Sequence, residues 1–183
     1  MNATDFFAFL SQRQSVRSFL SQPVEPEKLT RCLEAARLAP SACNAQPWTF
    51  VVVTEPVLRE QVAESAAGGV LPLNHFTRQA PVLIVVVRES PNFTSGLGQV
   101  VKNKEFTVMD VGMATLQLSL QATAEGLGSC ILGWFNEKRV KELLAIPARK
   151  RAELIVALGY PSSPGVRPKL RKPLSEMVRY NRY

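Results

Sequence analysis

Two neutral amides stand in a short stretch of small residues, where a flat heterocycle with mixed polar edges could bind. The stretch runs from Ala39 to Trp48 and carries Asn44 and Gln46. Each amide side chain offers both a hydrogen-bond donor and an acceptor, so the pair can match such an edge. Loops also collect these residue types because amides cap their own backbone, which is the structural alternative. Residues elsewhere in the chain must decide between the two interpretations.

Two clusters of cations lie at opposite ends of the chain. Arg13, Ser15 and Arg17 alternate, so in an extended segment their side chains point the same way. Two guanidiniums and a hydroxyl on one side can seat an oxyanion, because the guanidinium fork matches phosphate geometry; an exposed basic turn is the alternative. The tail 167–172 holds four cations in six residues. A small ligand that bears a phosphate explains both clusters as well as a nucleic acid does.

The chain offers little for metal or nucleophilic chemistry. Its three cysteines, Cys32, Cys43 and Cys130, form no metal-spaced pair. Their odd number argues against a disulfide framework and suits a reducing compartment. The single histidine, His75, argues against a His-based metal site or a Ser-His triad. We therefore expect no metal site, and we expect His75 to be a solvated loop residue.

Length and composition are those of a globular protein. The chain has 183 residues, 46% hydrophobic and 20% charged, with a net charge of +7. A chain of this size buries roughly 70% of its unfolded surface, enough for one core. No apolar run reaches the roughly 20 residues of a membrane span, and the N-terminus lacks a signal-peptide pattern. We expect a soluble, cytoplasmic protein with one domain over 1–183, in which 161–183 forms an extended, proline- and cation-rich arm.

Helical and strand patterns alternate along the chain. Apolar residues from Leu29 to Ala36 recur with helical spacing after Pro26, which suits the first turn of a helix. The run Val82–Val87 is apolar throughout, which predicts a strand buried on both faces. Strands separated by helices predict a mixed α/β sandwich. The other expected elements are strands Thr49–Thr54, Cys130–Leu132 and Arg151–Tyr160 and helices Pro56–Ala66 and Asn136–Leu144.

A long helix is expected from Thr107 to Gly126. Thr107 and Asp110 fit a capping box, so we expect Asp110 to be a cap or dipole partner rather than a catalytic acid. Apolar residues on nearly all sides predict a central helix rather than a surface one. The segment Arg88–Lys104 before it has no period and predicts a long loop, a common form of lid or binding edge.

Three segments together resemble the flavin-dependent nitroreductase family, in particular its small single-domain members. The first is Arg13-x-Ser15-x-Arg17-x-Phe19, which looks like the phosphate-binding opening motif of that family. The second is Ala39-Pro40-Ser41-x-x-Asn44-x-Gln46-Pro47-Trp48. The third is the glycine-rich run 126–133 with the basic tail 168–173; this run is neither G-x-G-x-x-G nor a Walker loop. The likeness covers almost the whole chain, and it rests on the order and spacing of the three segments.

The resemblance implies an α/β (α+β) nitroreductase-like sandwich, with a mixed sheet flanked by helices. It implies an obligate homodimer with exchanged C-terminal arms and both FMN sites at the interface. The cations would hold the phosphate and ribityl side, the 40–46 loop would lie against the isoalloxazine of the neighbouring subunit, and the 131–133 backbone would face flavin N5. The implied cofactor-binding residues are Arg13, Gln14, Ser15, Arg17, Pro40, Ser41, Asn44, Gln46, Ile131, Leu132, Gly133, Lys169 and Arg171.

By the same resemblance the protein is an FMN-dependent oxidoreductase. NADH or NADPH would reduce FMN, and a nitroaromatic, quinone or similar small acceptor would then take the hydride in a ping-pong cycle. FMN carries this chemistry, so no catalytic side chain is expected. The loop at 88–104 is shorter than in the larger members of the family, which leaves the acceptor open.

Two alternatives remain open from the residues. The same fold could serve a flavin reductase or a reductive dehalogenase. A basic, non-enzymatic nucleic-acid-binding protein is the alternative of another class. Against it, the aromatic residues, such as Phe9 and Phe50, fall within apolar patterns rather than alternating with cations. We therefore expect neither a nucleic-acid nor a membrane partner.

Overall fold

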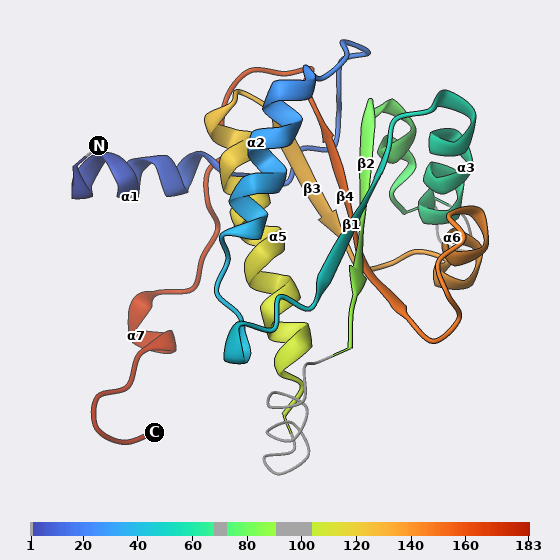
Figure 1. Ribbon diagram of the computed structural model, residues 1–183. Coiled ribbons are helices and arrows are strands. Elements are labelled where there is room, and N and C mark those ends of the chain that lie inside the picture. Colours follow the sequence, from blue (N-terminus) through green and yellow to red (C-terminus); the bar gives the residue numbers. More distant parts are fainter. Residues whose placement is uncertain (1, 68–72, 91–103) are drawn as a thin grey trace.

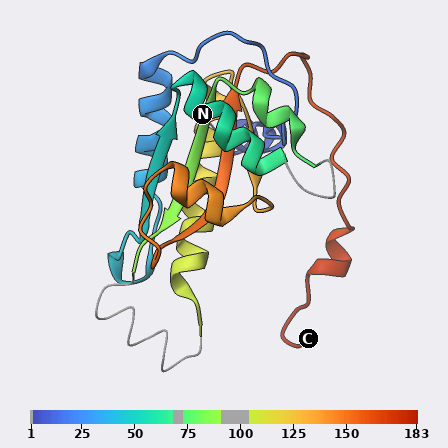
Figure 2. The same ribbon diagram turned by 90° about the vertical axis from the view of Figure 1, so that its right-hand side faces the viewer.

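Helices cover both faces of a four-stranded sheet (Figures 1 and 2). The computed structural model describes residues 2–67, 73–90 and 104–183. The strand order is β1-β2-β4-β3, and each of these neighbouring pairs is antiparallel. The expected α+β sandwich is confirmed, but its expected mixed sheet is not, because the parallel pairing is a single bridge between Ser15 and Ser129. The strands are β1 (Trp48–Val53), β2 (Val82–Arg88), β3 (Gly128–Leu132) and β4 (Arg151–Gly159).

Strand β2 lies in the middle of the core, as its apolar run predicts. Every residue from Val82 to Val87 is buried. Side chains alternate along a strand, so Ile84 and Val86 pack in the cluster with helices α2 (Pro26–Arg37) and α5 (Phe106–Ala124). Leu83 and Val85 pack in the opposite cluster, with α3 (Pro56–Ala67) and α6 (Glu137–Leu143). Both faces therefore need apolar residues, and the run has no polar interruption.

Helix α5 differs from its sequence-based prediction in two respects. It begins at Phe106 with Glu105 as its N-cap, so the predicted capping box of Thr107 and Asp110 is wrong. It is also not buried all round. Leu118 and Ala122 are fully buried toward α2 and the sheet, whereas other apolar residues of the helix are exposed. The exposed ones are Val108, Met109, Met113 and Leu116.

The predicted element boundaries agree closely with the structure. Strand β3 begins at Gly128, two residues before the predicted Cys130, and β4 ends one residue before the predicted Tyr160. Of the predicted loop 88–104, residues 91–103 lie outside the described part of the chain. The remaining elements are α1 (Ala3–Gln12), η1 (Ala42–Asn44), η2 (His75–Gln79) and α7 (Leu174–Met177). His75 is exposed at the start of η2, as expected.

The C-terminal segment runs beside the N-terminal one before it leaves the body of the protein. Pro161 bridges to Phe19, and the Ser162 amide donates to the Ser18 carbonyl at 3.1 Å. Beyond residue 169 the tail carries α7 and extends away from the sheet (Figure 1). None of the helices that the structure describes is long and apolar enough to cross a membrane.

The close approach of residue 16 to the start of β3 requires glycine at position 128. A Cβ atom at Gly128 would lie 2.6 Å from Val16 Cγ2 and 2.8 Å from Val16 Cβ. Gly128→Ala should therefore displace the segment around Val16 and lower the free energy of unfolding by about 1–3 kcal/mol. Urea denaturation measures this change.

Gly112→Ala is the matched control, because Gly112 lies within α5 and an added Cβ would meet nothing within 4 Å. This control should stabilise the protein by up to about 1 kcal/mol through helix propensity. Equal effects of the two substitutions would contradict the predicted contact.

Candidate functional site

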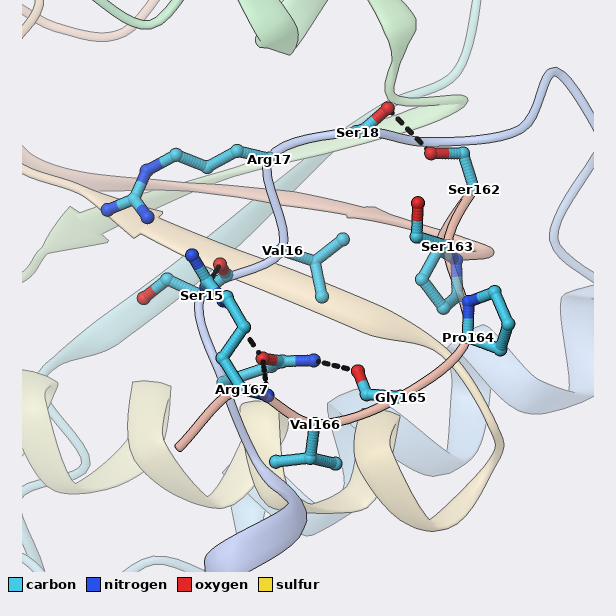
Figure 3. A pocket seen from close by; sticks show the side chains of 12 residues that line it. Ser15, Val16, Arg17, Ser18, Ser162, Ser163, Pro164, Gly165, Val166 and Arg167 are labelled. Carbon is cyan, nitrogen blue, oxygen red and sulfur yellow. Dashed lines mark hydrogen bonds between the residues drawn. The ribbon is translucent and has the colours of Figure 1, made fainter. Parts of the chain in front are cut away.

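The first predicted cation cluster extends the edge of the sheet. Ser15 forms a parallel bridge with Ser129 of β3, and the Val16 amide donates to the Ser129 carbonyl at 2.9 Å. Arg17 lies close enough to Cys130 of the same strand for its charge to oppose the rise that burial causes in the pKa of that thiol. Ser15 and Arg17 point to one side of the segment and Val16 to the other (Figure 3). The alternation that the sequence predicts is therefore present, with a hydroxyl and a guanidinium on one side.

The basic tail is hydrogen-bonded to this segment. Gln14 Nε2 donates to the Gly165 carbonyl at 2.8 Å, and Gln14 Oε1 accepts from both the backbone amide and Nε of Arg167 at 3.1 Å. The Arg167 guanidinium also donates to the Ser15 carbonyl, and Lys169 Nζ donates to the Arg13 carbonyl, both at 2.5 Å. Figure 3 shows Gly165 and Arg167 facing the segment that carries Ser15. Side chains of each segment thus hold the backbone of the other.

Five cations gather where these segments meet, and we call this group the cation seat. It consists of Arg13, Arg17, Arg167, Lys169 and Arg171. In the described part of the chain no carboxylate forms an ion pair with any of them. Burial, followed by the neighbouring arginines, lowers the pKa of Lys169. A pocket of about 610 Å³ is lined by all five. Crowded cations beside a pocket, without a carboxylate partner among the described residues, create a positive potential that favours an anion.

The amide-bearing loop has an unusual backbone. Cys43, Asn44 and Gln46 have positive φ angles of 52°, 51° and 46°, a region that residues other than glycine rarely adopt. The Gln46 amide donates to Ser41 Oγ at 2.9 Å, and Gln46 Nε2 lies 3.2 Å from the Asn44 carbonyl and 3.3 Å from its Oδ1. Pro40 and both amide-bearing residues are exposed. The loop is thus internally hydrogen-bonded, as the structural alternative expects, and still presents polar side chains to the outside.

The end of β3 passes from the core to the surface. Leu132 is buried in the core beneath α6, whereas Gly133 is exposed and Ile131 half-buried. The Trp134 carbonyl, one residue further on, accepts from Asn74 Nδ2 at 3.1 Å. Gly133 and the side chain of Trp134 therefore lie at the surface here, and the role implied for 131–133 stays a prediction.

The predicted site residues form two groups that lie apart within one chain. The cation seat, Gln14, Ser15 and the end of β3 lie together at the sheet edge. The loop 40–46 follows the C-terminal end of α2, and both views place it well away from the segment after α1 that contributes to the seat (Figures 1 and 2). Neither pocket beside the cation seat is lined by a residue of this loop.

The family of the chain follows from comparison with known proteins. The family model described as Nitroreductase family matches residues 10–160. The chain belongs to this family. As a nitroreductase family member it is an oxidoreductase.

Individual nitroreductase relatives cover nearly the whole chain. A putative NAD(P)H nitroreductase of Streptococcus pyogenes is 29% identical over 94% of this chain and 98% of its own. An iodotyrosine deiodinase of Thermotoga neapolitana is 30% identical over 94% and 95%. Among solved structures, an FMN-dependent nitroreductase of Clostridium difficile is 25% identical, with a TM-score of 0.80 over 97% of this chain and 99% of the other.

Sequence reasoning missed one member of the cation seat. The sequence indicates Arg167 only as part of a basic tail, yet its guanidinium forms hydrogen bonds that join the tail to residues 14 and 15. The signal was available, because Arg167, Lys169 and Arg171 alternate as the N-terminal cluster does, and alternate residues of an extended segment share a side. The N-terminal strip of the seat (Arg13 and Arg17) and its C-terminal strip (Arg167, Lys169 and Arg171) therefore both place cations at alternate residues.

Both the oxygen and the nitrogen of the Gln14 side-chain amide form hydrogen bonds with the tail. The role of Gln14 can therefore be tested through the mobility of the tail. Gln14→Ala removes three hydrogen bonds, each worth about 1 kcal/mol net. We expect trypsin to cleave after Lys169 at least about 5-fold faster, since 1 kcal/mol raises the open population by that factor. Mass spectrometry of timed digests measures this rate.

The control for Gln14→Ala is Gln12→Ala, because Gln12 is exposed at the end of α1. Unchanged cleavage in Gln14→Ala, or the same increase in Gln12→Ala, would show that Gln14 does not hold the tail.

Proposed function

We propose that the protein binds FMN and uses NADH or NADPH to reduce a small electron-poor acceptor such as a nitroaromatic or a quinone. The observation that carries the proposal is the cation seat, which lacks a carboxylate partner among the described residues. Family membership and the FMN-dependent relative from Clostridium difficile support the choice of cofactor. The NAD(P)H nitroreductase from Streptococcus pyogenes supports the choice of electron donor.

The chemistry of the residues fits FMN. Guanidiniums of Arg13 and Arg171 suit the phosphate, since charge-assisted forks are strong and directional. The hydroxyl of Ser15 lies on the side of the segment that Arg17 shares (Figure 3), where it suits the polar ribityl chain. Ser41, Asn44, Gln46 and Pro40, contributed by a second subunit, suit the polar and flat faces of the ring.

When bound, FMN supplies the hydride and electron chemistry. The residues of the chain then have to bind, orient and set the electrostatics. Arg17 lies near Cys130 of β3, so its positive charge would stand near the pyrimidine side and favour negative charge there. The backbone of 131–133 would support the N5 edge. No side-chain acid or base is required by this arrangement.

The separation of the two residue groups supports a homodimer with exchanged arms. Exposed apolar side chains on α1 and α5, including Phe6, Phe7, Met109 and Leu116, provide a surface of the kind that marks protein contacts. The extended tail exposes further apolar residues and reaches outward.

We infer one domain over 1–183 with an arm at 161–183, acting in the cytoplasm. Light scattering should give twice the 20.2 kDa chain mass; a monomer that binds FMN fully would contradict the dimer.

Reductive dehalogenation is the second candidate function. The observation that favours it is the 30% identity to the iodotyrosine deiodinase of Thermotoga neapolitana. A flavin reductase role would need only FMN turnover by NAD(P)H, without a further bound acceptor. A nucleic-acid-binding role has the net charge of +7 and the two cation clusters in its favour, but no aromatic residues alternate with these cations.

Cofactor binding and turnover test the proposed function directly. The purified protein should be yellow or bind added FMN, and should oxidise NADH or NADPH only with FMN and an acceptor present. Parallel assays with a nitroaromatic, a quinone, an iodinated phenol and free flavin separate the candidate reactions. A protein that shows no flavin absorbance after saturation with FMN would refute the proposal.

Removal of one seat cation should separate phosphate from ring binding. A charge-assisted hydrogen bond is worth about 1.5–3 kcal/mol, so Arg171→Ala should weaken FMN binding by roughly 10- to 150-fold. Riboflavin lacks the phosphate, and its affinity should change far less. Fluorescence titration with both ligands measures the difference.

The neighbouring Lys172 supplies the control for Arg171→Ala. It is out of phase with the alternating cations, so Lys172→Ala should leave FMN affinity within about 2-fold, as weakly coupled surface charges do. Equal losses for FMN and riboflavin in Arg171→Ala would show that the tail does not bind the phosphate.

A further inference from the structure

Asp110 is a buried carboxylate for which the proposed reaction has no use. It lies in α5 and is only 3% exposed. Its Oδ1 and Oδ2 atoms each lie 3.2 Å from the backbone amide of Ala42, and among the described residues no cation pairs with it. Burial raises the pKa of Asp110, and the Ala42 N–H partly opposes this shift. A buried acid with one backbone donor among the described residues is costly for the fold, so its presence needs an explanation.

The segment held by Asp110 is the strained loop. Left-handed φ angles at Cys43, Asn44 and Gln46 cost of order 1–3 kcal/mol each and persist only where the surroundings enforce them. The hydrogen bonds that Gln46 forms with residues 41 and 44 stay within the loop and cannot set its position on the protein. The Ala42–Asp110 bond is different, because it joins the first turn of the loop to a helix in the core.

We propose that Asp110 is the positioning residue of the strained loop, residues 41–46. Through the Ala42 amide, the Asp110 carboxylate fixes this loop in the conformation that presents Ser41, Asn44 and Gln46 to the flavin ring. The inference rests on the proposed FMN site for the identity of the ligand. The hydrogen bond between Asp110 and the Ala42 amide, in contrast, is present in the chain without ligand.

A carboxylate is better suited to this task than an amide of the same shape. An ionised Asp only accepts hydrogen bonds, and both of its oxygens can face one N–H. Asn at this position would bring two N–H donors into a buried site beside the donor of Ala42. A bond to a charged acceptor is also about twice as strong as a neutral one. Asp110→Asn therefore keeps the volume of the side chain and weakens the hold on the loop.

Ala42→Pro removes the same bond from the other side. Proline has no N–H, so Asp110 stays in place and loses its donor. The backbone tolerates the change, because Ser41 is extended (φ −146°, ψ 153°), as a residue before proline prefers. Proline is also favoured at the first position of a helical turn. The two substitutions together form a double-mutant cycle on one hydrogen bond.

Two measurements on the full-length protein test the proposal. Riboflavin and FMN titrations should show that Asp110→Asn and Ala42→Pro each weaken both ligands equally, by about 10-fold, and that the double variant is no weaker than either. Hydrogen exchange of the ligand-free protein should show faster exchange in the peptide 43–48 for the same variants. The matched control is Thr115→Val, a change at another buried polar residue of α5 whose hydroxyl bonds Val111.

Each outcome has a distinct meaning. Unchanged exchange in 43–48, additive losses in the double variant, or an equal loss in Thr115→Val would overturn the role of Asp110. Faster exchange in a protein that binds no flavin would uphold the hold on the loop and refute the proposed FMN site. A loss for FMN without a loss for riboflavin would place Asp110 with the cation seat and contradict a role at the ring. Thermal unfolding of each variant identifies any that fails to fold, and Ala42→Pro then replaces Asp110→Asn as the test.

Discussion

The candidate site depends on the pairing of residues 15 and 16 with the first residues of β3. This pairing is short, a single parallel bridge and one amide bond to Ser129. It nevertheless decides where every cation of the N-terminal strip points, because the register fixes which side chains share a face. The tail is in turn positioned on this strip through Gln14, Arg167 and Lys169. Gly128 makes the approach possible, since any Cβ there would meet Val16.

The sequence predicts elements well wherever one local rule dominates. The apolar run of β2 predicts its burial, and Pro26 starts α2 as expected. The prediction that α5 is buried on all sides fails, because the local sequence pattern does not distinguish an apolar face that packs in the core from one that is exposed on a single chain. Met109 and Met113 belong to the second kind. Their exposure depends on tertiary structure, and it supports the dimer that we propose.

The candidate site was predictable as a set of residues and not as a geometry. The alternation of Arg13, Ser15 and Arg17 predicts a shared side, and the motif order indicates the family. No local rule predicts that the Gln14 amide binds the tail, since its partner Gly165 lies 151 residues away. The same holds for Asp110, whose sequence neighbours suggest a cap while its partner Ala42 lies 68 residues away. Long-range partners of polar side chains are what the sequence leaves undetermined.

Both halves of the site contradict what stability alone would favour. Five cations line one pocket without a carboxylate partner among the described residues. Three residues of the loop 41–46 have left-handed φ angles, and this loop is hydrogen-bonded to the buried Asp110. Each arrangement costs free energy in the chain without ligand, and such conflicts concentrate at functional sites. An anion in the seat would remove the first cost, and a ligand bound to the folded chain stabilises it through mass action. The loop cost differs, because Asp110 and Ala42 maintain that conformation before any ligand arrives. On the proposed function, a bound anion would therefore complete the seat, whereas the loop would be held in its binding conformation in advance.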